Sequence, residues 1–274
     1  MNLVESFLTK NPCWVNNINA KQLYDSGSDK RYWQFQQSGP KGLMLHSVGC
    51  AQPNAQVFLN GWNNANYTYS CVHGIIDANT GTVYQCLKWN YRGWHGGGSS
   101  NNTHVGVEMC ESGYIAYDNP NDYSKFSVKD KAKAQADCAR AYNAAVELFA
   151  MICKQYNLNP LKDIVSHYEG GKMGIASGHG DPEHYWKGLG MGYTMDGFRS
   201  DVKKAMEPPA PAPTFENPFT DVAKGKFYYE PVLWCAERGI VNGKTKDTFA
   251  PNDGATRGEI ATMIYRLAAY LGKV

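Results

Sequence analysis

The sequence contains no apolar run that approaches the roughly 20 residues required by a membrane-spanning helix. It also lacks a strong surplus of either charge, because charged residues make up only 19% of the chain and the formal net charge is +2. This composition favours neither nucleic acid nor a membrane surface as the partner. The first residues, Met1 to Glu5, lack a basic region followed by an apolar stretch, so they do not resemble a signal peptide.

No Cys-x-x-Cys pair occurs among the eight cysteines, which argues against a structural zinc ribbon. The cysteines are scattered over strand-like and helix-like segments, as expected of small buried thiols. An even number permits disulfides, whereas synthesis in the cytosol favours free thiols.

A proline-rich break divides the chain. The segment Glu207–Thr214 alternates Pro with Ala, a composition typical of an extended spacer without a core of its own. A chain of 274 residues accommodates one medium domain and one small one. We therefore predict a first domain over residues 1–206, a linker over 207–214 and a second domain over 215–274.

The first domain combines strand-like runs with one long helix. The predicted strands are Gly42–His46, Tyr69–Ile76, Thr82–Leu87 and His104–Met109. Residues 129–156 contain no Gly or Pro, and apolar residues from Ala132 and Ala136 to Phe149 and Ile152 repeat at helical spacing. Strands and helices in this order predict an α+β domain. The second domain has helix candidates only, at 228–238 and 257–271.

Three potential metal ligands lie at the ends of strand-like or rigid segments. His46 closes the apolar run Gly42–Leu45, and His167 follows the short run 163–166. Asp181 precedes a proline in the segment His179–Pro182. Such positions can hold side chains in a fixed geometry, although any single histidine is more often a structural residue.

Six short segments, in order, resemble the zinc-dependent N-acetylmuramoyl-L-alanine amidases, whose fold is shared by the peptidoglycan recognition proteins. They are Leu45–Ser47, Val72–Asp77 with Gly81–Tyr84, Gly93–Gly97, Val105–Glu108, Ser166-His167 and Asp181-Pro182. The resemblance spans roughly residues 40 to 190 and implies a mixed central β-sheet flanked by helices. It also implies hydrolysis of the amide that joins N-acetylmuramic acid to L-alanine.

The resemblance assigns roles to individual residues. It implies that His46, His167 and Asp181 hold a zinc ion, which leaves a fourth position open as a catalytic zinc requires. It further implies that Glu108 is the general base. On the strand 104–109, Glu108 would face away from Val105 and Val107.

The chain departs from the family pattern at two positions. Family members often carry Lys or Thr where this chain has His179, which leaves His179 as either a donor to the oxyanion or a competing metal ligand. Some phage members have Tyr where this chain has Val72, so the catalytic burden shifts to Glu108. The resemblance places the remaining substrate contacts at His73, Trp94 and His95.

The second domain resembles one S-layer homology motif. The matching segments are Phe219–Val222, Trp234–Val241, Thr248–Pro251 and Thr256–Glu259. Such motifs bind secondary cell-wall polymers, usually as three copies, so a single copy suggests assembly of three chains into a homotrimer. Arg257 could bind a carboxylate-bearing sugar, or it could pair with Glu259 at a helix N-terminus.

The predicted function is zinc-dependent cleavage of peptidoglycan by a protein made in the cytoplasm that reaches the wall after release, as phage lysins do. The main alternative is a non-catalytic peptidoglycan-binding protein of the same fold. The presence of competent residues at all three ligand positions argues against that alternative. A structural wall protein led by its S-layer-like segment is a third interpretation. Stem-peptide specificity and the choice between phage lysin and host autolysin stay open.

Overall fold

The computed structural model describes the chain except for residues 12, 14–38, 120–121 and 208–214. The chain divides into two compact units, Met1–Glu207 and Pro208–Val274, and each is described by itself. Among the described residues, no helix is both long and apolar enough to cross a membrane.

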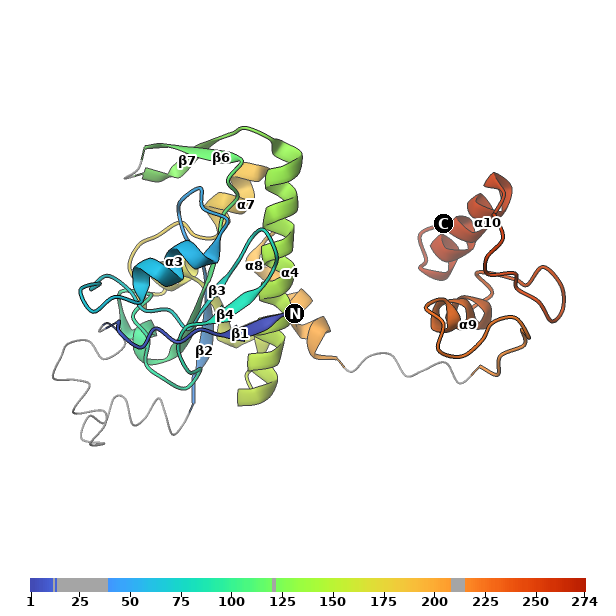
Figure 1. Ribbon diagram of the computed structural model, residues 1–274, viewed down its shortest axis with the longest axis horizontal. Helices are drawn as coiled ribbons and strands as arrows, with labels where there is room; N and C mark the ends of the chain where they lie inside the picture. Colours follow the sequence, from blue (N-terminus) through green and yellow to red (C-terminus); the bar gives the residue numbers. More distant parts are fainter. Residues whose placement is uncertain (12, 14–38, 120–121, 208–214) are drawn as a thin grey trace. The chain divides into compact units, whose positions relative to one another are not determined.

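A six-stranded mixed sheet forms the centre of the first unit (Figure 1). In spatial order its strands are β1 (Leu3–Glu5), β4 (Val83–Gln85), β3 (Gly74–Ile76), β5 (His104–Met109), β2 (Gly42–Ser47) and β8 (Ile164–Ser166). All neighbouring strands run parallel except β3 and β4, which form an antiparallel pair. Every residue of β2 is buried. The predicted mixed sheet is confirmed, and its strand β2 is the one that carries His46.

Helices pack against this sheet and around its edges. The longest, α4 (Lys131–Tyr156), runs beside the sheet with α8 (Met195–Met206) against it (Figure 1). Asp130 caps the first turn of α4 by accepting a hydrogen bond from the Lys133 amide, and Asn157 ends the helix in the left-handed conformation. The shorter helices are α3 (Ala55–Trp62), η2 (Ser99–Asn102), α5 (Pro160–Asp163), α6 (His167–Lys172) and α7 (Glu183–Leu189).

The buried face of α4 differs from the predicted one. Ala132 and Ala136 are exposed, whereas Ala134 and Cys138 are buried. Small alanines occur all around this helix, so they carry little information about its inner side. The larger Phe149 does lie on the buried side, as predicted.

Several elements have only weak local signals in the sequence. The predicted strand 69–76 shrinks to β3, because Cys71 instead pairs with Trp94 in an isolated bridge. A separate hairpin of β6 (Ile115–Asn119) and β7 (Asp122–Val128) precedes α4. Its Phe126 ring packs so closely on Gly188 that a β-carbon there would lie 2.4 Å from the ring. Tertiary packing therefore stabilises this polar hairpin.

The second unit contains α9 (Tyr229–Glu237) and α10 (Arg257–Tyr270), as predicted. Its small hydrophobic core is built around Phe219, Val222 and Val232. Asp221 accepts hydrogen bonds from the Phe249 and Ala250 amides, at 2.8 and 2.6 Å, and so fastens the loop between the helices. No residue of α10 is buried within the described part of the chain.

Candidate metal centre

His46 occupies the penultimate position of β2, where the strand reaches the edge of the sheet. Strand β2 pairs with β5 on one side and β8 on the other, and the register sets His46 opposite Glu108. Only 1% of the His46 surface is exposed. Its backbone is therefore held by two neighbouring strands.

His167 begins α6, directly after β8. Ser166 caps this helix: its hydroxyl accepts a hydrogen bond from the Glu169 amide, and the Glu169 carboxylate accepts one from the Ser166 amide. The Ser166 hydroxyl also donates to Glu183 at the start of α7, at 2.6 Å. This bond ties the helix of His167 to the helix that follows Asp181.

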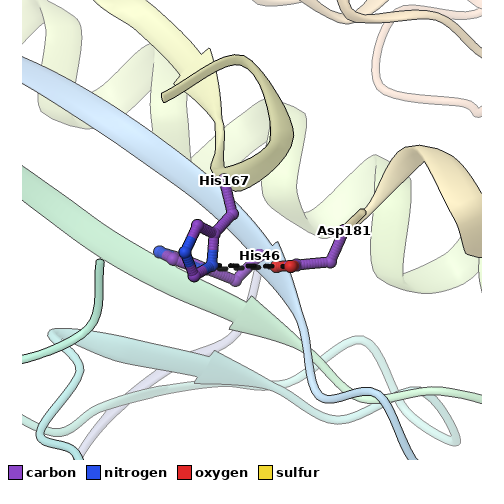
Figure 2. Close-up of side chains that lie close together, drawn as sticks. All are labelled: His46, His167 and Asp181. Carbon is purple, nitrogen blue, oxygen red and sulfur yellow. Dashed lines mark hydrogen bonds and ion pairs between the residues drawn. The ribbon is translucent and has the colours of Figure 1, made fainter. Parts of the chain in front are cut away.

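The side chains of His46, His167 and Asp181 converge on one point (Figure 2). The two Nδ1 atoms lie 3.0 Å apart, and each lies 3.4 Å from a carboxylate oxygen of Asp181. All three residues are buried. The structure thus brings together residues that are far apart in the sequence. His46 and His167 are separated by 121 positions, and His167 and Asp181 by 14.

These distances fit a tetrahedral metal. With metal–ligand bonds of about 2.0–2.1 Å, neighbouring ligand atoms of a tetrahedron lie about 3.3 Å apart, close to the 3.0 and 3.4 Å observed. Two imidazoles and one carboxylate are also a ligand set that zinc accepts. The residues present therefore fit the zinc site that the amidase resemblance implies.

His46 and Asp181 hold the charge states that metal binding needs. Burial lowers the pKa of His46, which favours the neutral imidazole. Burial alone would raise the pKa of Asp181, but the neighbouring imidazoles of His167, His179 and His46 hold it well below its ordinary value. Asp181 is therefore ionised at neutral pH, and the cluster is poised for a cation.

Glu108 lines the same cleft as the cluster. Burial raises the pKa of Glu108 well above its ordinary value, and the charges of Asp181 and Glu111 raise it further. Its Oε2 atom is inaccessible to solvent and has no hydrogen-bond partner among the described residues. A carboxyl group in this environment accepts a proton readily.

His179 lies at the outer side of the cluster. Its ring stacks on the His167 ring with centroids 4.2 Å apart and an angle of 6° between the planes. Its Nδ1 lies 3.6 Å from Asp181, and this contact raises the pKa of His179. About half of its side chain is exposed, so it could face a substrate in the cleft. His179 is not part of the three-residue cluster within the described chain.

An open cleft of about 1080 Å³ surrounds these residues. Tyr67 and Tyr69 lie on its wall, as do Tyr168 and Lys172 of α6. Tyr69 is 79% exposed, and the Lys172 ammonium lies 4.1 Å from the centre of the Tyr168 ring. Exposed aromatic rings and one cation suit a ligand that combines sugar, amide and carboxylate groups.

The three predicted substrate contacts have other surroundings. His73 is fully buried: its Nε2 lies 2.7 Å from the Tyr91 carbonyl, and its Nδ1 accepts from the Gly106 amide. The prediction that it lines the groove is corrected, because it has no exposed surface. Trp94 packs against the core and does not line the cleft. His95 does line the cleft, but both of its ring nitrogens have protein partners.

Sequence reasoning missed a polar network beside the cluster. Glu111 is fully buried and accepts hydrogen bonds from the Ser47 hydroxyl at 2.7 Å and the Tyr117 hydroxyl at 2.5 Å. Tyr117 also lies 2.8 Å from His184 Nε2. Burial raises the pKa of Glu111 to about 7. No sequence motif marks Glu111, whose partners come from β2, β6 and α7.

Arg257 is the first residue of α10. The helix begins with a capping box in which Glu259 accepts from the Thr256 amide. Arg257 is exposed and forms no ion pair within the described part of the chain. The alternative pairing with Glu259 is therefore not seen.

The first unit therefore combines a mixed sheet with a buried His-His-Asp cluster in an open cleft. Residues 36–184, more than half of the chain, match the family of N-acetylmuramoyl-L-alanine amidases, and the chain belongs to that family. Residues 218–261 match the S-layer homology domain. The resemblance to both families is thereby confirmed.

One solved structure shares the fold of this chain, and a second is similar only in part. The Staphylococcus aureus hydrolase AmiA in complex with its ligand is 18% identical, with a TM-score of 0.52, and the match covers 75% of this chain and 83% of that one. The N-acetylmuramoyl-L-alanine amidase LysC from Clostridium intestinale URNW is 15% identical, with a TM-score of 0.33, and the match covers 68% and 95%. The first of these likenesses shows the shared fold. Comparison with curated proteins gives no match.

Proposed function

We propose that this amidase is zinc-dependent and hydrolyses the amide between the lactyl group of N-acetylmuramic acid and L-alanine. One observation carries the proposal: His46, His167 and Asp181 direct three donor atoms at one point in the cleft that Glu108 lines. Because all three positions hold competent ligands, a binding protein without catalysis is not favoured.

His46, His167 and Asp181 would hold the zinc ion. When bound there, zinc polarises a carbonyl oxygen and lowers the pKa of a coordinated water to about 7. The anionic Asp181 and the two imidazoles would leave a net positive centre. That positive charge would stabilise the ionised form of the buried Glu108 carboxylate.

Glu108 would take the proton of the attacking water and deliver it to the nitrogen of the leaving L-alanine. Its solvent-shielded Oε2 and its raised pKa support this role, because both favour the protonated form that must follow. His179 would donate a hydrogen bond to the oxygen of the tetrahedral intermediate. Its raised pKa and its half-exposed position beside Asp181 support that role.

The two units would have separate roles, catalysis and binding to the cell wall. Residues 1–206 would form the catalytic domain, 207–214 a spacer, and 215–274 the module that binds a secondary cell-wall polymer, with the exposed Arg257 as a contact. Because α10 buries no residue, the small unit leaves apolar side chains such as Ile264 and Tyr265 exposed. Assembly into a homotrimer through the single S-layer homology motif is part of the proposal, and sedimentation of the full chain would test it. We also propose that the protein is made in the cytoplasm and reaches the cell wall after release, as phage lysins do.

Digestion of purified peptidoglycan tests the catalytic part. We expect new N-terminal alanine to appear, and we expect a chelator or His46→Ala to abolish it. Lys162→Ala is the control, because Lys162 is exposed on α5 and does not line the cleft. Full activity of the metal-free enzyme would refute the zinc dependence.

A further inference from the structure

His95 lies directly behind His46. Its Nδ1 is 3.0 Å from His46 Nε2, and its Nε2 is 2.9 Å from the His104 carbonyl oxygen. A carbonyl oxygen only accepts, so His95 must carry its proton on Nε2. The bare Nδ1 of His95 then accepts a hydrogen bond from Nε2–H of His46.

This chain of bonds determines the tautomer of His46. With its proton on Nε2, neutral His46 presents a bare Nδ1 lone pair, and this is the atom that faces His167 and Asp181. A carbonyl acceptor placed behind an imidazole in this way is how proteins orient metal-ligating histidines. Here the carbonyl acts through an intervening ring, that of His95.

His167 has an equivalent partner. Its Nε2 lies 3.1 Å from the Ser177 hydroxyl, which itself donates to the Gly96 carbonyl at 3.2 Å. Because the hydroxyl proton is used on Gly96, the Ser177 oxygen accepts from Nε2–H of His167. His167 therefore also presents a bare Nδ1. Two lone pairs and a carboxylate then face one another without a proton between them, which is stable only around a cation.

One short segment, His95-Gly96, serves both ligands. The amides of His95 and Gly96 each donate to the Asn101 side chain at 2.8 Å, which fixes the segment in place. The His95 ring also lies flush against β5, since a β-carbon on Gly106 would lie 2.2 Å from its Cγ atom. The absence of a side chain at Gly106 is what admits the ring at this position.

We propose that His95 and Ser177, the orienting pair, are positioning residues for the metal: they set the tautomers of His46 and His167 so that both Nδ1 atoms point into the site. This inference rests on the proposed zinc dependence. It gives His95 a role behind the ligand rather than as the substrate contact that the family resemblance implied. Loss of a partner of this kind typically weakens metal binding by about 10- to 100-fold.

Zinc affinity of the full chain, measured by competition with a chromophoric chelator, tests the proposal. His95→Leu fills the space but accepts no hydrogen bond, whereas His95→Asn leaves space but places an acceptor near the former Nδ1. We expect about 10- to 100-fold weaker zinc binding in His95→Leu and recovery of much of that loss in His95→Asn. If His95 serves only packing, the order of the two variants reverses.

Ser177→Ala and Ser177→Thr form the second pair, because only the threonine retains the hydroxyl. We expect weaker binding in the alanine variant alone, and an altered visible spectrum of its cobalt-substituted form. Lys162→Ala is the control, because Lys162 is exposed on α5 and does not line the cleft. Circular dichroism of the metal-free variants checks folding, and the Ser177 pair decides the question if His95→Leu does not fold.

The outcomes separate the two proposals. A wild-type protein that binds no zinc would refute the proposed metal dependence. A wild-type protein that binds zinc, with His95→Leu and Ser177→Ala binding equally well, would overturn the orienting role while leaving the proposed function intact.

Discussion

Replacing Glu108 with glutamine should lower activity and raise the stability of the metal-free protein. The general acid–base contribution of a positioned side chain is about 10²- to 10⁴-fold, so we expect a loss of that size in the rate of L-alanine release. The amide has nearly the shape of the carboxylate but neither accepts nor carries the transferred proton.

The gain in stability follows from the surroundings of Glu108. Burial, followed by the charges of Asp181 and Glu111, raises the pKa of Glu108 well above its ordinary value. A carboxyl whose pKa is raised on folding costs stability once the pH exceeds its unfolded pKa, and the cost grows until the pH passes the folded pKa. Removing the charge should therefore raise the free energy of unfolding of the metal-free protein at pH 8.

Urea unfolding of chelator-treated protein at pH 4.5 and pH 8 measures this effect. We expect Glu108→Gln to unfold at a higher urea concentration than wild type at pH 8, and the difference to shrink at pH 4.5. Glu5→Gln, at an exposed residue of β1, is the control and should change stability by less than about 0.5 kcal/mol. A Glu108→Gln variant that is less stable than wild type at pH 8 would refute the claim that the ionised Glu108 destabilises the metal-free fold.

Three further predictions concern other parts of the molecule. Ser166→Ala removes the N-terminal cap of α6 and the hydrogen bond to Glu183. It should lower the free energy of unfolding in urea by about 1–2 kcal/mol and weaken zinc binding. Unchanged zinc affinity would show that this hydrogen bond does not position the ligands. Ser47→Ala removes a hydrogen-bond donor to the buried Glu111 and should lower the free energy of unfolding by about 1–3 kcal/mol at pH 8. The loss should be smaller below the Glu111 pKa of about 7, because Glu111 is then protonated in both proteins. A loss that does not change with pH would contradict this prediction. Truncation after Glu207 should preserve release of L-alanine from soluble fragments and abolish sedimentation with intact walls; a truncated protein that still sediments with walls would place the anchor in the first unit.

Much of the framework follows from local sequence. The strands at β2 and β5, the long helix α4 and the two helices of the second unit all have strong apolar patterns or clear end signals, and the structure contains each of them. By contrast, β1, the β6–β7 hairpin and the helices α7 and α8 have no such signal. Their segments are short or polar, and they depend on contacts with distant parts of the chain, such as Phe126 on Gly188.

The family and the three residues His46, His167 and Asp181 could be predicted from the sequence alone, because the family pattern lies in the residue types and in their order along the chain. The residues that surround this cluster could be identified only in the folded chain. In the folded chain His73 is fully buried, His95 lies against His46, Ser177 lies against His167, and Glu111 is buried beside Ser47. The physical reason is that a ring nitrogen is oriented by whichever carbonyl or hydroxyl lies opposite it. Those partners come from segments whose spacing along the chain carries no signal.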